Sequence, residues 1–350
     1  MLVLHNPDHA RHAGRQEMFR GRLVPCHEVP QRLDHVLAEL RRRGLGRLAT
    51  PGPEDDMAFE ALLQRVHAPR YLRFLARAWD DWVALDPANA ALDALPSVWP
   101  VRGFRADVEP DNFAARMGLY SFDAGTPLTA GSWAAARTGA RCAVQAAQAV
   151  AGGERAAFAL TRPPGHHAGA DFFGGYCFLN NAALAAEALR AAGHARVAVL
   201  DVDYHHGNGT QALFYERADV FFASIHGDPR TEYPFYLGHA DERGAGAGAG
   251  CNLNLPLPRG TGFAAWRAGL ATALEAIGAY GAGALVVSLG VDTFEGDPIS
   301  GFRLASADYL TLGRDLAALA LPTVFVFEGG YAVDEVGVNT VNVLEAFSAA

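Results

Sequence analysis

The residues of this chain best suited to chemistry follow an apolar run near its middle. Residues 197–200 read Val-Ala-Val-Leu, and Asp-Val-Asp-Tyr-His-His begins at Asp201. An apolar run bounded in this way is typical of a strand buried on both faces of a parallel sheet. Asp203 and His205 are two residues apart, so they share one side if the chain stays extended. A carboxylate and an imidazole on one side form half of a metal site that suits zinc.

A second candidate zinc ligand follows another apolar run, residues 284–289. Asp292 can complete a site with Asp203 and His205, and three protein ligands leave a coordination position open for water and substrate. The ligand crevice of an open α/β sheet lies beyond the carboxyl ends of its strands, where these residues are expected.

Acid–base and oxyanion-stabilising groups follow two more apolar runs. After residues 156–160, a Pro-Pro-Gly segment precedes His166 and His167, which could serve as general base and general acid because imidazole titrates near neutral pH. After residues 323–327, two glycines precede Tyr331, whose phenol can donate a hydrogen bond to an oxyanion.

The surrounding pattern predicts how these segments are positioned. Strands alternate with helices, which indicates an α/β fold with a parallel sheet covered on both faces. The predicted strands are 2–4, 156–160, 197–202, 220–225, 253–255, 284–289 and 323–327. The predicted helices are 31–44, two within 57–80, 131–150, 180–192, 211–216, 263–280, 306–319 and 334–347. Residues 9–22 are expected to form a polar loop, and 86–130 a long irregular insertion in a single domain spanning 1–350.

Composition excludes several other classes of protein. No apolar run reaches the roughly 18 to 20 residues that cross a bilayer, and no secretory signal is visible. The four cysteines are widely spaced, which indicates free thiols in the reducing cytoplasm. A net charge of -9 argues against a nucleic-acid partner and fits a cationic small molecule.

Four motifs, taken in order along the chain, resemble the histone deacetylase superfamily. They are Arg162-Pro163-Pro164-Gly165-His166-His167, residues 201–209 (Asp-Val-Asp-Tyr-His-His-Gly-Asn-Gly), Gly290-Val291-Asp292 and Glu328-Gly329-Gly330-Tyr331. Further segments are similar to the bacterial acetylpolyamine amidohydrolase branch of that superfamily. These are residues 20–25, 174–178, 226–229 and 291–300, and the chain length matches as well.

The resemblance implies a three-layer arginase/deacetylase-type fold with a central, mostly parallel sheet flanked by helices. It implies one catalytic zinc held by Asp203, His205 and Asp292. It also implies that Asp201 supports His166 and that Asn208 supports His167. The anionic Asp201 would make the His166 imidazole more basic, whereas the neutral amide of Asn208 would leave the His167 imidazole a weaker base. Tyr331 would polarise the acyl carbonyl.

The family further implies a narrow tunnel lined by Gly175 and Tyr176. It also implies one or two structural potassium ions. The first would lie near Asp201, Asp203, His205, Ser224 and Ile225. The second would use the carbonyls near Phe214, Arg217, Val220 and Cys251.

The expected reaction removes acetyl groups from small acetylated diamines or polyamines, such as acetylputrescine or acetylcadaverine, and releases acetate and the free amine. The far amine of such a substrate is cationic and needs an acid or an aromatic face. The candidate acids are Asp123 and Glu17, and the candidate aromatics are Tyr176 and Tyr233. Two glutamates that some relatives carry are replaced here, by Gly125 and Ala114.

A protein or acetyl-lysine deacetylase of the histone deacetylase type is the alternative, because the chemistry is the same for both substrate classes. A binuclear manganese ureohydrolase of the same fold would need bridging carboxylates where this chain has Gly207 and Gly290. A non-catalytic binding protein would not need the intact ligands, histidine pair and tyrosine. By the same resemblance, residues 86–130 should form a homodimer interface and narrow the tunnel mouth.

Overall fold

A central sheet of eight strands organises the computed structural model, which describes residues 1–53 and 55–350. The strand order is β4-β1-β5-β10-β9-β6-β7-β8, and every neighbouring pair is parallel. The strands are β1 (Leu2–His5), β4 (Arg47–Ala49), β5 (Ala156–Leu160), β6 (Val197–Asp201), β7 (Val220–Gly227), β8 (Asn252–Leu257), β9 (Ala284–Leu289) and β10 (Thr323–Phe327). The prediction of a parallel α/β sheet is confirmed.

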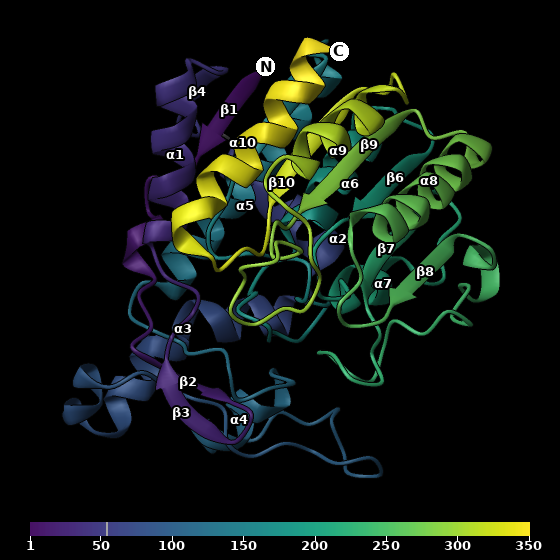
Figure 1. The fold of residues 1–350 in the computed structure, drawn as a ribbon. Helices are drawn as coiled ribbons and strands as arrows, with labels where there is room; N and C mark the ends of the chain where they lie inside the picture. The colour runs from purple at the N-terminus through teal and green to yellow at the C-terminus, as the bar shows by residue number, and fades with distance from the viewer. Residues whose placement is uncertain (54) are drawn as a thin grey trace.

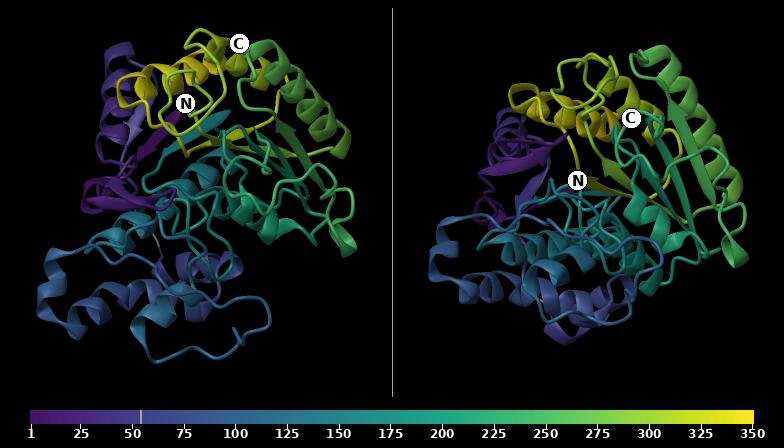
Figure 2. Two further views of the ribbon diagram at one scale, coloured as in Figure 1. Left: turned by 60° about the horizontal axis from the view of Figure 1, so that its bottom comes forward. Right: turned by 90° about the horizontal axis from the view of Figure 1, so that it is seen from below.

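Helices cover both faces of this sheet (Figures 1 and 2). One face packs against α1 (Gln31–Arg43), α8 (Phe263–Tyr280), α9 (Asp308–Ala317) and α10 (Val333–Ala349). The other packs against α2 (Asp56–Val66), α3 (Pro69–Leu85), α5 (Ser132–Ala151) and α6 (Asn181–Ala191). Successive strand residues alternate between the two cores: Ala157 and Ala159 pack on one side, and Phe158 and Leu160 on the other. Both faces are therefore apolar, which is why the strands read as continuous apolar runs.

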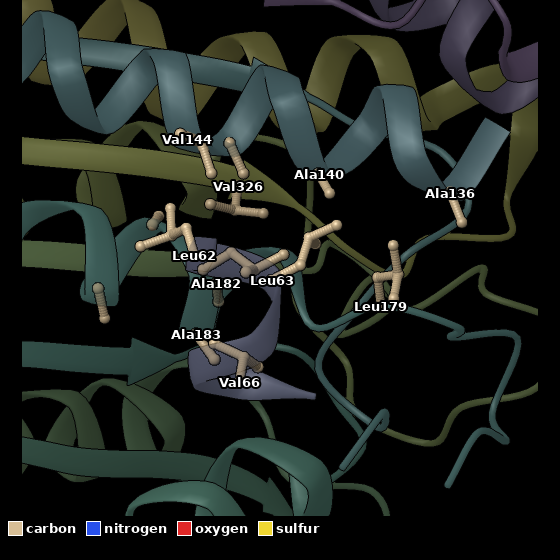
Figure 3. Packing of buried hydrophobic residues seen from close by; sticks show 14 of the residues in the cluster. Leu62, Leu63, Val66, Ala136, Ala140, Val144, Leu179, Ala182, Ala183 and Val326 are labelled. Atoms are coloured by element: carbon tan, nitrogen blue, oxygen red, sulfur yellow. The ribbon is translucent and has the colours of Figure 1, made fainter. Parts of the chain in front are cut away.

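Small residues bring one helical layer close to the sheet. Ala136, Ala140 and Val144 recur at four-residue spacing on α5 and face the core that contains Val326 of β10 (Figure 3). Leu62 of α2 packs into the same core. The Ala-rich composition of residues 131–150 thus reflects close packing against the sheet.

The order of the strands brings the chemically interesting segments together. β5, β10, β9 and β6 are consecutive neighbours at the centre of the sheet. They are parallel, so the segments that follow them emerge at one edge. The strands β9 and β10 enter late in the chain and fill the space between β5 and β6.

Three sequence predictions were wrong or incomplete. The predicted polar loop at 9–22 contains a short 3-10 helix, η1 (His9–Arg11), and most of an antiparallel hairpin formed by β2 (Gln16–Phe19) and β3 (Arg22–Pro25). The strand β4 was missed because it has only three residues. The irregular segment 86–130 contains η2 (Pro87–Ala91) and the helix α4 (Phe113–Leu119). Such short elements bury too few residues to leave a periodic apolar pattern.

Two other short elements lie near the sheet edge. The helix α7 (Asn208–Phe214) follows β6, and η3 (Gly246–Gly248) lies in the glycine-alanine run before β8. In the part of the chain that the structure describes, no helix is both long enough and apolar enough to cross a membrane.

Candidate active site

Two carboxylates and one imidazole converge beyond β6 and β9. The Asp203, His205 and Asp292 side chains are buried, and each offers a ligand atom within 4.8 Å of the other two. His205 Nδ1 lies 2.9 Å from Asp292 Oδ2 and 3.4 Å from Asp203 Oδ1. The structure thus brings together the three side chains that the sequence predicts as metal ligands.

The prediction assumed that the chain stays extended from Asp203 to His205, but the structure brings these side chains together in a different way. Pairing of β6 ends at Asp201, and the backbone then bends. Each acid accepts a hydrogen bond from the backbone two residues on: Asp203 N–H donates to Asp201 Oδ1 at 3.2 Å, and His205 N–H donates to Asp203 Oδ1 at 2.9 Å. These local bonds form turns that hold the side chains in place.

This cluster fits a divalent cation. Among the residues that the structure describes, no lysine or arginine forms an ion pair with Asp203 or Asp292. Burial and the neighbouring Asp203 carboxylate raise the pKa of Asp292, because two buried negative charges repel. Buried charges need a partner, and a metal ion bound by two carboxylates and an imidazole supplies one.

The two adjacent histidines have different partners. His166 Nδ1 lies 2.9 Å from Asp201 Oδ2, and His167 Nδ1 lies 2.6 Å from Asn208 Oδ1. The ring centroids of the two histidines are 4.0 Å apart. This pairing matches the expectation from the sequence resemblance.

The pKa values of the two histidines shift in opposite directions. Burial lowers the pKa of His166, but the Asp201 and Asp203 carboxylates outweigh it and raise the pKa to about 10. Burial and the charge of His166 hold the pKa of His167 well below its ordinary value. One imidazole is thus suited to carry a proton and its neighbour to accept one.

The loop after β10 places Tyr331 in the same cavity. Gly330 has a φ of +130°, which a residue with a side chain rarely adopts. Tyr331 N–H donates to Asp297 Oδ2 at 2.7 Å, and the Arg32 guanidinium lies 4.7 Å from the Tyr331 ring centroid. Asp297 also accepts a hydrogen bond from Ile299 N–H, so this acid connects the two loops that carry Ile299 and Tyr331.

A cavity of about 290 Å³ opens over these groups. His167, His205 and Tyr331 line it together with all five predicted substrate-binding residues, Glu17, Asp123, Gly175, Tyr176 and Tyr233. Gly125, where some relatives carry a glutamate, also lines the cavity. The other lining residues, which sequence reasoning missed, are Met18, Phe19, Arg20, Ala124, Glu232, Phe235 and Ile299. A charge inside the aromatic-rich segment 232–236 is the only sequence signal that could have identified Glu232.

Gly175 packs against the His167 ring. Its φ is +54°, and a Cβ there would come within 2.2 Å of the His167 ring, so the position requires glycine. Asp123 supports this segment: Oδ2 accepts from Gly175 N–H and from the Tyr233 hydroxyl, each at 2.7 Å. Oδ1 accepts from Gly125 N–H and Thr126 Oγ1. Asp123 therefore links its own segment to the segments of Gly175 and Tyr233, all of which line the cavity.

Glu17 is the other acid proposed from the sequence. It lies on β2 with 1% of its surface exposed, and it accepts hydrogen bonds from the Tyr176 hydroxyl at 2.8 Å and His27 N–H at 3.2 Å. Burial raises its pKa to about 7 even though both hydrogen bonds oppose that shift.

The residues predicted to bind potassium lie on the neighbouring strands β6 and β7 and in the segment that follows β6. Asp201 of β6 pairs with Ser224 of β7, and Ile225 follows Ser224. Ser224 Oγ lies 2.8 Å from His226 Nδ1. Of the carbonyls suggested for a second ion, those of Phe214 and Cys251 already accept backbone hydrogen bonds.

Comparison with known proteins agrees with this geometry. Residues 26–347 match the family model described as the histone deacetylase domain. The chain is 53% identical to acetylpolyamine amidohydrolase 2 of Pseudomonas aeruginosa, over 99% of this chain and 98% of that protein. It is 47% identical to acetylpolyamine amidohydrolase of Mycoplana ramosa, over 99% of each. The crystal structure of acetylpolyamine aminohydrolase from Burkholderia pseudomallei superposes with a TM-score of 0.93 at 40% identity and covers 100% of this chain and 99% of that one.

Proposed function

The chain belongs to the histone deacetylase family, and from that premise we propose that it is a metal-dependent amidohydrolase. It removes acetyl groups from small acetylated diamines or polyamines, as the names of its relatives indicate. The observation that carries the proposal is a single cavity in which His205, His167 and Tyr331 meet above two buried carboxylates.

Asp203, His205 and Asp292 would hold one zinc ion per chain. The metal supplies a Lewis acid that polarises an amide carbonyl and lowers the pKa of water. Potassium would bind near Asp201, Asp203, His205, Ser224 and Ile225, as the family resemblance implies. The four cysteines are free thiols, which supports a cytoplasmic location.

The histidine pair would move the protons. His167 donates its Nδ1 proton to Asn208 Oδ1, which leaves Nε2 with a lone pair that accepts a proton from the attacking water. His166 bonds to Asp201 and stays protonated, which stabilises the negative charge that develops nearby. A histidine of the pair then protonates the leaving amine, so the products are acetate and a free amine.

Tyr331 would stabilise the oxyanion. Burial holds the pKa of Tyr331 well above its ordinary value, so the phenol keeps its proton and remains a donor. Its backbone bond to Asp297 and the Arg32 side chain against its ring limit the positions it can take.

The names of its relatives support small acetylated amines over acetyl-lysine in folded proteins. The cavity, of about 290 Å³, is of a size that suits a small linear amide. The deciding experiment compares kcat/KM for acetylputrescine, acetylcadaverine, N8-acetylspermidine and an acetyl-lysine peptide. We expect the acetylated amines to be the better substrates. A clear preference for the peptide would establish the protein deacetylase alternative instead.

Glu17 should make substrate binding depend on pH. A neutral carboxyl attracts an ammonium group weakly, whereas a carboxylate attracts it strongly. Because the pKa of Glu17 is about 7, KM for acetylputrescine should fall as pH rises from 6 to 8. Glu17→Gln should raise KM and remove this dependence. An unchanged profile in Glu17→Gln would assign recognition of the far amine to another residue.

The segment 86–130 would form a homodimer interface. Its exposed apolar side chains include Val98, Val101, Phe104 and Val108, each between 55% and 70% exposed. Apolar side chains gathered on one segment mark an interaction surface. Its last residues, Asp123 to Gly125, line the cavity, so an interface here would adjoin the substrate path.

Charges on this surface should therefore dissociate the dimer. We expect the wild type to be a dimer by light scattering at micromolar concentration, and the double variant Val101→Asp/Phe104→Glu to be a monomer. Met57→Asp introduces a charge at an exposed apolar residue of α2, outside the segment, and should leave the dimer intact. A monomeric wild type would rule out the interface.

A further inference from the structure

We propose that Arg20 makes this cavity prefer acetylated amines with one far ammonium group over those with two. The proposal rests on the function proposed above and specifies its substrate class. A second ammonium, as in an acetylated triamine, would have to lie at the mouth of the cavity beside a resident cation.

The hairpin places Arg20 at the mouth. Arg20 and Gly21 form the two-residue turn between β2 and β3, with φ values of +49° and +80° that are typical of a type I′ turn. Met18, Phe19 and Arg20 all line the cavity. The deep lining residues Glu17, His167 and Tyr331 are buried, whereas Arg20 and Phe235 are exposed, so these two mark the solvent end.

The charges along the cavity change sign toward this end. Glu17 and Asp123 line the inner part, and neither has an arginine or lysine partner among the described residues. Glu232 is neutralised by Arg259 at 3.2 Å. Arg20 is the one arginine among the lining residues that the structure describes, and no lysine is among them. A substrate with one ammonium can place it near the inner acids, but a further ammonium would meet Arg20.

Arg20 also occupies an aromatic face that a substrate cation could use. Its guanidinium lies over the Phe19 ring, 5.1 Å from the centroid. Phe19 lines the cavity, and ammonium groups bind aromatic faces at such distances. The resident cation therefore repels a second ammonium and removes one of its binding surfaces.

The effect of Arg20 on kcat/KM should be modest, because Arg20 is exposed to solvent. Two like charges several ångströms apart in a largely solvated site interact weakly, and salt screens them. We expect Arg20→Asn to raise kcat/KM for N8-acetylspermidine, which carries two free amines, by about 3- to 10-fold. The value for acetylputrescine, which carries one, should change by less than about 2-fold, because its ammonium lies deeper. The gain should shrink as salt is raised to 1 M.

The chain offers matched controls. Asn-Gly is a favoured type I′ dipeptide, so Arg20→Asn should preserve the turn. Arg22→Asn removes a charge from an exposed residue of the same hairpin that does not line the cavity, and it should leave the substrate ratio unchanged. Arg20→Lys keeps the charge and should retain the discrimination against N8-acetylspermidine.

Each outcome decides the proposal. An unchanged substrate ratio in Arg20→Asn, or an equal change in Arg22→Asn, would overturn the role of Arg20 while leaving the amidohydrolase function intact. If the wild type hydrolyses neither acetylated amine, the proposed function fails and this inference with it. A ratio that changes in Arg20→Asn but not in Arg22→Asn or Arg20→Lys supports the proposal.

Discussion

Asp292→Asn should leave the protein with no stoichiometric metal and with activity reduced to background. The substitution keeps the shape of the side chain and an oxygen for Tyr204 N–H, which donates to Asp292 Oδ1 at 2.7 Å. It removes one of the two negative charges that balance a divalent cation. Metal content measured by mass spectrometry should fall from one metal per chain in the wild type, and Asp203→Ala and His205→Ala should do the same.

Asp297→Asn is the matched control for metal content. Asp297 is also a buried acid of the segment after β9, but it accepts hydrogen bonds from the backbone N–H groups of Ile299 and Tyr331. This variant should keep one metal per chain. Full metal content in Asp292→Asn would show that the three side chains are not the ligands.

Two metals per chain would instead support a ureohydrolase, which the local packing opposes. A Cβ at Gly207 would come within 2.2 Å of Asp201 Oδ2, and one at Gly290 within 2.0 Å of Asp203 Oδ2. These are the positions at which a second metal would need carboxylates. The Asp201 and Asp203 carboxylates occupy the space that a side chain would need at these positions, so a larger residue cannot be accommodated without moving them.

The strands were predictable because both of their faces are buried. Residues 284–289 and 323–327 match β9 and β10 in both bounds, since a continuous apolar run leaves little freedom in where the strand ends. The order of the strands, in contrast, could not be predicted from local sequence patterns. Nothing in the local pattern places β9 and β10 between β5 and β6. The rule that ligands bind beyond the carboxyl ends of parallel strands suggested that Asp292 joins Asp203 and His205, and the family resemblance specified the complete site.

The hairpin that lines the cavity was harder to predict than the strands of the central sheet, for a physical reason. The hairpin that carries Glu17 and Arg20 is short, and its strands show no apolar alternation. Its inward residue Glu17 is a buried acid, which sequence patterns assign to the surface. Glu17 was nevertheless predicted as a candidate acid, whereas Glu232 was missed, because the burial of Glu232 depends on Arg259, 27 residues further along the chain.

Tyr331→Phe should lower kcat by roughly 100-fold or more, which is the scale for removing one oxyanion donor. KM should change little, because the phenol contributes mainly in the transition state. The ring contacts that hold the residue should remain: the Tyr176 ring centroid lies 5.5 Å away and the Arg32 guanidinium 4.7 Å away. The loss would therefore reflect the hydroxyl group and not the packing.

Tyr309→Phe tests that distinction. Tyr309 is also a buried tyrosine near the site, and its hydroxyl bonds to Thr293 and to the Val291 carbonyl, but it does not line the cavity. Its replacement should lower the melting temperature and leave kcat within about 2-fold, because a lost buried hydrogen bond affects folding and not the reacting carbonyl. The metal content of both variants should stay at one per chain. If Tyr331→Phe retains full turnover with its metal bound, the oxyanion donor is a different group, and the loop that positions Tyr331 has a structural role instead.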